Sequence, residues 1–138
     1  MLKEIKVMVG AHKVLCVLAF ATFGASCSQQ VSYENDVNPI LVDSCLTCHT
    51  GKGEGLEASG FSVRTYDELM KGTKFGPVVI PGDSSSSSLY RMIDHKVDRK
   101  IQMPPHHKES LASGMKDKLT LEQINIIKLW IDQGAKNN

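Results

Sequence analysis

The chain has 138 residues, a length that suits a single compact domain and leaves little room for a second. Its 16 Lys and Arg side chains nearly balance its 15 Asp and Glu side chains, which excludes the strong basic excess typical of nucleic-acid-binding proteins. Aromatic residues make up only 6% of the chain, so a core of aromatic rings is not expected. A domain of this size would gain stability from a bound apolar group or a covalent cross-link.

The first 26 residues have the organisation of an export signal. A basic head with three lysines is followed by an apolar run over residues 14–23, which is about half of what a membrane-spanning helix needs. Small residues come directly after this run, as they do before a signal cleavage site. We therefore expect residues 1–26 to be a signal peptide, with a retained anchor helix as the alternative.

One cysteine, Cys16, lies inside the expected signal, and Cys27 stands directly after it. The placement of Cys27 resembles a bacterial lipobox, although Gly24 occupies the position where that motif usually has a Leu-like residue. The alternative is an ordinary cleavage site followed by a free thiol, which would be a liability in an oxidising compartment. We expect lipidation at Cys27, attachment to a membrane through that lipid, a tether over residues 27–31 and a domain over residues 32–138.

The domain contains four predicted helical segments and little strand signal, so the expected fold class is all-α with long loops. The first segment covers residues 33–48, where Pro39 favours a helix that starts at an Asn38 cap after a separate turn. The serine run 84–88 is predicted to be a turn that leads into the N-terminus of the third segment. The other segments are residues 66–71, 86–94 and 120–134, and the loops include residues 51–60 and 74–82.

Capping residues mark two of these segments. Thr65 with Glu68, and Thr120 with Gln123, have the spacing of capping boxes, and a glycine follows the end of each segment. The last segment presents one apolar face, which we expect to pack on the first helix. That face consists of Leu121, Ile124, Ile127, Trp130 and Ile131.

The pattern Cys-x-x-Cys-His, formed by Cys45, Cys48 and His49, is the attachment motif for haem c. Two thiols three positions apart can reach the two vinyl groups on one edge of a porphyrin and add across them as thioethers. The adjoining His49 is then held beneath the iron as its proximal ligand. We therefore predict one covalently attached haem, with Trp130 and its neighbouring isoleucines packed against the haem edge.

Two alternatives to haem attachment remain open. Cys45 and Cys48 could bind zinc together with histidines. They could instead form a redox dithiol, although the alternating strands of a thioredoxin-like unit are not evident in the sequence. The histidines that could complete a zinc site are His95, His106 and His107.

Methionine is the usual sixth ligand in an electron carrier, because its soft sulfur favours Fe(II) and raises the reduction potential. Met103 precedes Pro104 and Pro105, which cannot join a helix and would present its sulfur from a stiff, extended loop. Met70 and Met92 lie in predicted helices and are expected in the core. The rival distal ligands are His95, His106 and His107.

An ordered series of segments resembles the Planctomycete-type cytochrome c domain over residues 32–135. The segments are residues 33–41, 45–49, 76–77, 80–83, 88–90, 103–105 and 119–135. The resemblance implies a class I cytochrome c-like fold, with three to five helices and long loops around one covalent haem and with terminal helices that cross beside it. It also implies that Met103 is the distal ligand. Residues 110–118 depart from the family, because this link is longer and more polar than usual.

These observations favour a periplasmic electron carrier that exchanges electrons with other redox proteins. Catalysis is not expected, because an iron with six ligands has no open coordination site. The alternatives are a haem-based ligand sensor or small haem enzyme with a displaceable sixth ligand, and a zinc-stabilised interaction module. Basic residues crowd the region of Met103 and form either a solvated surface or a positive ring that steers acidic partners. They are Lys96, Arg99, Lys100 and Lys108.

Overall fold

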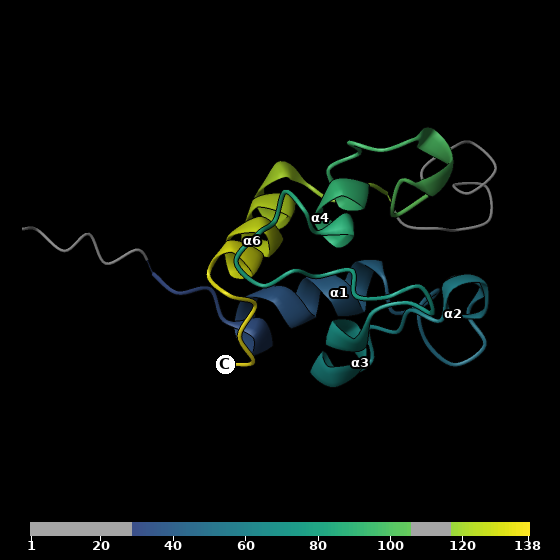
Figure 1. The fold of residues 1–138 in the computed structure, drawn as a ribbon, viewed down its shortest axis with the longest axis horizontal. Helices are drawn as coiled ribbons and strands as arrows, with labels where there is room; N and C mark the ends of the chain where they lie inside the picture. Colours follow the sequence, from purple (N-terminus) through teal and green to yellow (C-terminus); the bar gives the residue numbers. More distant parts are fainter. Residues whose placement is uncertain (1–28, 106–116) are drawn as a thin grey trace, which may run out of the picture.

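The structure is a computed structural model that describes residues 29–105 and 117–138. Its elements are η1 (Tyr33–Val37, a π-helical turn), α1 (Asn38–Ser44), α2 (Glu54–Ser59), α3 (Tyr66–Lys71), α4 (Ser88–Ile93), η2 (Arg99–Ile101, a 3₁₀ turn) and α6 (Leu121–Asp132). Within the described ranges no β-strand forms, so the predicted all-α class is confirmed. In Figure 1, α4 and α6 lie above α1, α2 and α3.

Several predictions concern parts of the chain outside the described residues, which exclude residues 1–28 and 106–116. The signal peptide over residues 1–26 and the lipidation site at Cys27 are two of them. The others concern His106, His107 and Lys108, together with most of the polar link over residues 110–118.

The first predicted segment consists of two helices rather than one. Ser32 caps η1, where its hydroxyl accepts a hydrogen bond from the backbone N–H of Asn35 at 3.2 Å. The α-helix then begins at Asn38 with Pro39 in its first turn, where the missing N–H of proline has no helical partner to lose. The separate turn before Asn38 is therefore confirmed. The predicted Asn38 cap is wrong, because Val37 is the N-cap and Asn38 is the first helical residue. The predicted end at residue 48 is also wrong, because α1 ends at Ser44.

The segments with local capping signals form where they are predicted. The Thr65 hydroxyl accepts from the N–H of Glu68 at the start of α3. At the start of α6, Thr120 and Gln123 form a reciprocal capping box, an arrangement that satisfies two helix-end donors. Leu121 is 84% exposed and lies off the core, so its assignment to the apolar face of this helix is wrong.

A short helix, α2, occupies the stretch over residues 51–60 that the sequence predicts to be a loop. Glu54 and Glu57 lie in its first turn, where carboxylates are favoured, and Gly60 ends it with a positive φ of 75°. None of its residues is buried, so it has no apolar periodicity for a sequence analysis to detect.

The serine run forms the predicted turn before α4, but α4 begins at Ser88 rather than at residue 86. Ser87 occupies the N-cap position and is fully buried, yet its hydroxyl does not bond to the helix. It accepts from the N–H of Ile80 at 2.8 Å and donates to the carbonyl of Asp83 at 2.8 Å. Ser87 therefore fixes the loop before the helix rather than the helix end.

The core is mostly aliphatic, as the low aromatic content indicates, but aromatic rings fill the contact where α6 packs on η1. Trp130 is buried, with its ring centroid 5.6 Å from Tyr33, and Tyr33 meets Tyr66 edge-on at 5.1 Å. The Tyr66 hydroxyl donates to the carbonyl of Ala135 at 2.8 Å, so this half-buried ring has its polar group satisfied. The predicted packing of the last helix on the first helical segment is confirmed at this contact (Figure 1).

Candidate functional site

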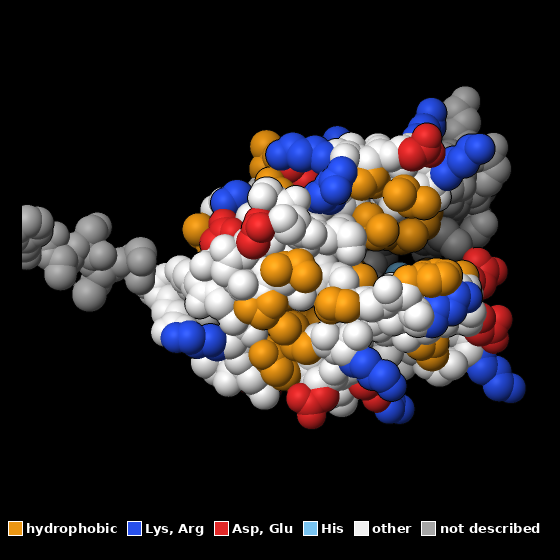
Figure 2. Space-filling view, viewed as in Figure 1, with side chains coloured by type: hydrophobic (Ala, Val, Ile, Leu, Met, Phe, Trp, Pro, Cys, Tyr) orange, Lys and Arg blue, Asp and Glu red, His pale blue; other side chains and the backbone are white. Residues whose placement is uncertain are grey.

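A cavity of about 890 Å³ lies between α4 and the segment that follows α1. The face shown in Figure 2 is hollowed between two groups of apolar side chains, and Lys and Arg side chains flank both groups. The walls come from most of the elements of the domain. They include Cys45, Cys48, His49, Phe61, Leu89, Met92, Ile93, Ile101 and Met103.

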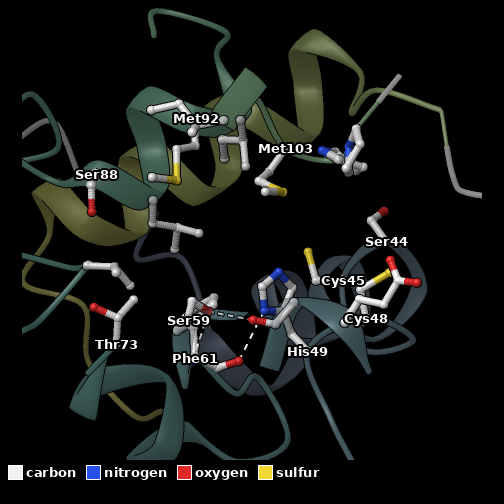
Figure 3. Close-up of a pocket in the computed structure, with 18 of the residues that line it drawn as sticks. Ser44, Cys45, Cys48, His49, Ser59, Phe61, Thr73, Ser88, Met92 and Met103 are labelled. Carbon is white, nitrogen blue, oxygen red and sulfur yellow. Dashed lines mark hydrogen bonds between the residues drawn. The ribbon is translucent and has the colours of Figure 1, made fainter. Parts of the chain in front are cut away.

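The two cysteines of the predicted attachment motif lie at one end of this cavity (Figure 3). Residues 45–49 form a turn after α1, in which the N–H of His49 donates to the carbonyl of Cys45 at 3.0 Å. Both thiols are free, and burial raises the pKa of Cys45 to about 12, with smaller contributions from Cys48 and Asp43. At neutral pH Cys45 therefore carries a protonated thiol.

His49 presents one ring nitrogen to the cavity. Its Nδ1 atom lies 3.1 Å from the carbonyl oxygen of Phe61, which can only accept, so Nδ1 carries the hydrogen. Burial lowers the pKa of the imidazole, and the Phe61 hydrogen bond opposes this shift only in part. A neutral ring with hydrogen on Nδ1 has its lone pair on Nε2, which faces the cavity on the side of Met103 (Figure 3). This arrangement is the one that a metal-ligating histidine requires.

Gly55 in α2 is a site residue that sequence reasoning did not find. A Cβ atom at this position would lie 2.6 Å from Cε1, 2.8 Å from Nε2 and 2.9 Å from Nδ1 of His49. Real Cβ atoms do not approach other atoms so closely, so only glycine lets α2 pack against the imidazole. No local sequence signal marks Gly55, because the constraint on it comes from the His49 ring and not from its own helix.

Met103 faces His49 from the opposite wall (Figure 3). The N–H of Met103 donates to the carbonyl of Met92 at 3.2 Å, which joins this segment to the end of α4. The side-chain amide of Gln102 donates to the carbonyls of His95 and Val97 at 3.2 and 3.1 Å. The chain bends at Met103, and its peptide bond to the following proline is cis.

The remaining candidate residues differ in whether they line the cavity. His95, a rival distal ligand, is not among the residues that line the cavity. Met92 is expected in the core but lines the cavity instead, so that prediction is wrong, whereas Met70 packs against the core as expected. Trp130 does not line the cavity, which places it away from the predicted contact with a haem edge.

The residues around the cavity fit a haem. Two thiols lie at one end, a neutral imidazole nitrogen and a thioether sulfur face each other across the middle, and the remaining wall is largely apolar. A macrocycle is large, flat and apolar, so such walls match it better than they match a hydrated ion. Over residues 29–105 and 117–138, no three His, Cys, Asp or Glu side chains gather to hold a metal ion by themselves. His106 and His107, which the zinc alternative invokes, lie outside the described residues.

Residues 45–107 match the family described as Planctomycete cytochrome C. No curated protein matches the chain, and no solved structure matches it. The match includes Cys45, Cys48 and Met103, and over residues 45–107 it confirms the resemblance that the sequence segments indicate.

Proposed function

Because residues 45–107 are a Planctomycete cytochrome C segment, we propose that this protein is a monohaem c-type cytochrome that carries electrons and catalyses no reaction. One observation carries the proposal: His49 Nε2 and the sulfur of Met103 face each other across a cavity with two thiols at its end (Figure 3). His49 and Met103 would together supply the two protein ligands of a haem iron.

The chain's own residues divide the work of holding the cofactor. Cys45 and Cys48 would retain the macrocycle through thioethers, so that loss of an axial ligand does not release it. The Phe61 carbonyl holds the His49 ring in one tautomer and one orientation. Met103 supplies a soft sulfur, and the apolar walls exclude water, which favours the less charged, reduced state. When bound, the haem supplies an iron that alternates between Fe(II) and Fe(III).

The packing of α6 on η1 supports a class I cytochrome c-like fold for this domain. In that fold the first and last helices cross beside the haem. Here the aromatic contact between Tyr33 and Trp130 joins the first and last helical elements of the described chain. The cavity then lies between α4 and the cysteine turn, with long loops over residues 60–65 and 73–87 around it.

We further propose that the protein is exported and anchored on the periplasmic side by a lipid on Cys27. The pattern of residues 1–26 supports the export step, and covalent haem attachment in bacteria takes place outside the cytoplasm. No helix among the described residues is long and apolar enough to cross a bilayer.

The mouth of the cavity is the proposed place for electron exchange with partner proteins. Phe75 is 86% exposed and Ile101 is 45% exposed, and both line the cavity. Exposed Lys74, Arg99 and Lys100 stand beside them. An apolar centre with cations at its rim suits transient docking of acidic redox proteins.

The test is an absorption spectrum of the mature protein, made in a host with haem c maturation machinery. We expect a c-type reduced spectrum and the weak red band of methionine-bound ferric iron, which Met103→Ala abolishes and Met70→Leu in the core retains. Haem without that band, together with fast carbon monoxide binding, would favour the ligand sensor or small haem enzyme. Protein without haem would overturn the proposal.

A further inference from the structure

Side chains with hydroxyl groups line the cavity at both of its ends (Figure 3), and Ser59, near the middle, donates its hydroxyl hydrogen to the carbonyl of Gly55. Ser44 lies beside Cys45 and Cys48 at one end. Ser88 and Thr73 lie on facing walls at the other end, beyond Met92. The wall between these ends is largely apolar, so the hydroxyls of Ser88 and Thr73 are separated from the polar groups at the cysteine end.

Ser88 differs from its neighbours in the serine run. The Ser85 hydroxyl donates to the Asp83 carboxylate at 2.6 Å, and the Ser87 hydroxyl is used within the turn. The half-buried Ser88 lines the cavity, and its hydroxyl has no hydrogen-bond partner among the described residues. Solvent still reaches this hydroxyl, which is therefore free to donate to a ligand that enters the cavity.

Thr73, on the opposite wall, already has its hydrogen bonds. Its hydroxyl accepts from the N–H of Phe75 at 3.0 Å and donates to the carbonyl of Gly76 at 3.1 Å. The hydrogen bonds of the turn over residues 73–76 are therefore made within the turn. The residue after Thr73 is a cation, Lys74. Ser88 is left as the donor at this end of the cavity.

The chemistry of the cofactor defines what Ser88 would meet. This step rests on the proposed function, because it assumes a haem bound through both cysteines. A haem carries its two vinyl groups on one edge and its two propionates on the opposite edge. With the vinyl edge fixed at Cys45 and Cys48, the carboxylates would lie toward the opposite end of the cavity, which holds Ser88. A carboxylate in such surroundings needs a hydrogen-bond donor.

We propose that the Ser88 hydroxyl donates a hydrogen bond to a haem propionate. The serine run then has two tasks: residues 84–87 build the turn before α4, and Ser88 holds the carboxylate edge of the cofactor. Because Ser88 and Met92 lie one helical turn apart on α4, the same helix face that covers the macrocycle also supplies this donor. Ser88 is a positioning residue, and the iron ligands are unchanged by it.

The experiment uses the full-length holoprotein and compares Ser88→Ala, Ser88→Thr and Ser86→Ala. Ser86 is the matched control, because it is an exposed serine of the same turn that does not line the cavity. The readout is the propionate bending band in the resonance Raman spectrum, which responds to hydrogen bonding at the carboxylate. The visible spectrum of each variant reports separately on the iron ligands.

We expect Ser88→Ala to shift the propionate band without changing the visible spectrum, and Ser88→Thr and Ser86→Ala to match the wild type. Loss of haem from Ser88→Ala that Ser88→Thr restores would support the same assignment. An unshifted band in Ser88→Ala, an equal shift in Ser88→Thr, or loss of haem from both variants would overturn it. Failure of the wild type to bind haem would instead refute the proposed function.

Discussion

The Nδ1 atom of His49 lies 3.1 Å from the carbonyl oxygen of Phe61, so a backbone group twelve residues away determines which nitrogen of the ring faces the cavity. The same two residues meet as rings, with centroids 5.1 Å apart and planes inclined by 67°. Gly55 packs directly against the imidazole ring of His49. The orientation of His49 is thus fixed by α2 and by the chain after α2, and not by the motif alone.

Replacement of Gly55 by alanine should displace His49. In an exposed helix this change would stabilise the protein by about 1 kcal/mol, because alanine is the better helix former. Here the added Cβ would lie 2.6 Å from the imidazole, and overpacking of this kind costs about 1–3 kcal/mol. We expect a partly high-spin visible spectrum, haem retained on the cysteines, and a lower free energy of unfolding in urea.

Glu57→Ala gives the control for that experiment, because Glu57 is exposed on the same helix. It should leave the visible spectrum unchanged. A Gly55→Ala protein that is more stable than the wild type, with an identical spectrum, would show that α2 does not constrain His49.

Removal of the Gln102 amide should loosen Met103. This side chain donates two hydrogen bonds, to the carbonyls of His95 and Val97, and it directly precedes the methionine. At about 1 kcal/mol for each of the two bonds, Gln102→Ala should make displacement of Met103 up to roughly thirtyfold easier. Imidazole binding to the ferric protein, followed by the loss of the methionine band, measures this change.

Arg99→Lys, in the same segment, keeps its charge and should bind imidazole as the wild type does. Equal imidazole affinity in Gln102→Ala and in this control would mean that the Gln102 hydrogen bonds do not hold the methionine in place.

Much of the fold could be predicted because its signals are local. A threonine cap and a following glycine mark α3 and α6, and each of these signals depends on residues within one helical turn. The helix α2 carries no such signal, since its N-cap is Gly53 and none of its residues is buried. Its close approach to His49 is a tertiary contact, and no local pattern encodes it.

The candidate site divides in the same way. The Cys-x-x-Cys-His spacing predicts Cys45, Cys48 and His49, because covalent haem attachment requires these residues close together in the sequence. The Phe61 carbonyl could not be predicted, since every residue has one and only the fold selects which carbonyl meets the ring. Met92 has the spacing of a core residue, and only the position of α4 beside a cavity distinguishes the two roles.

Reversal of the charge at Lys100 should slow electron exchange with an anionic reagent. Lys100 is exposed next to Ile101, which lines the mouth of the cavity. Lys100→Glu should lower the rate of reduction by hexacyanoferrate(II) roughly threefold at low ionic strength, because it replaces attraction with repulsion. The effect should vanish near 1 M salt, where the Debye length is about 3 Å.

Lys71→Glu supplies the matched reversal, because Lys71 is an exposed residue of α3 that does not line the cavity. Its effect on the rate should be smaller at every salt concentration. Equal slowing by both variants would attribute the effect to net charge and remove the case for a docking face at the cavity mouth.

The carboxylate of Asp83 should contribute stability that acid removes. Hydrogen bonds from Ser85 and Ser86 lower the pKa of Asp83 to about 2, with the Ser85 hydroxyl as the largest cause. A folded-state pKa below the unfolded value of about 3.9 means that the contribution is complete above that value and is lost as the pH falls toward 2. Asp83→Asn should therefore lower the Tm at pH 7, and its Tm should approach that of the wild type between about pH 4 and pH 2. Ser85→Ala should reduce the same pH-dependent difference, whereas parallel Tm curves for Asp83→Asn and the wild type across this range would show that these hydrogen bonds do not stabilise the fold.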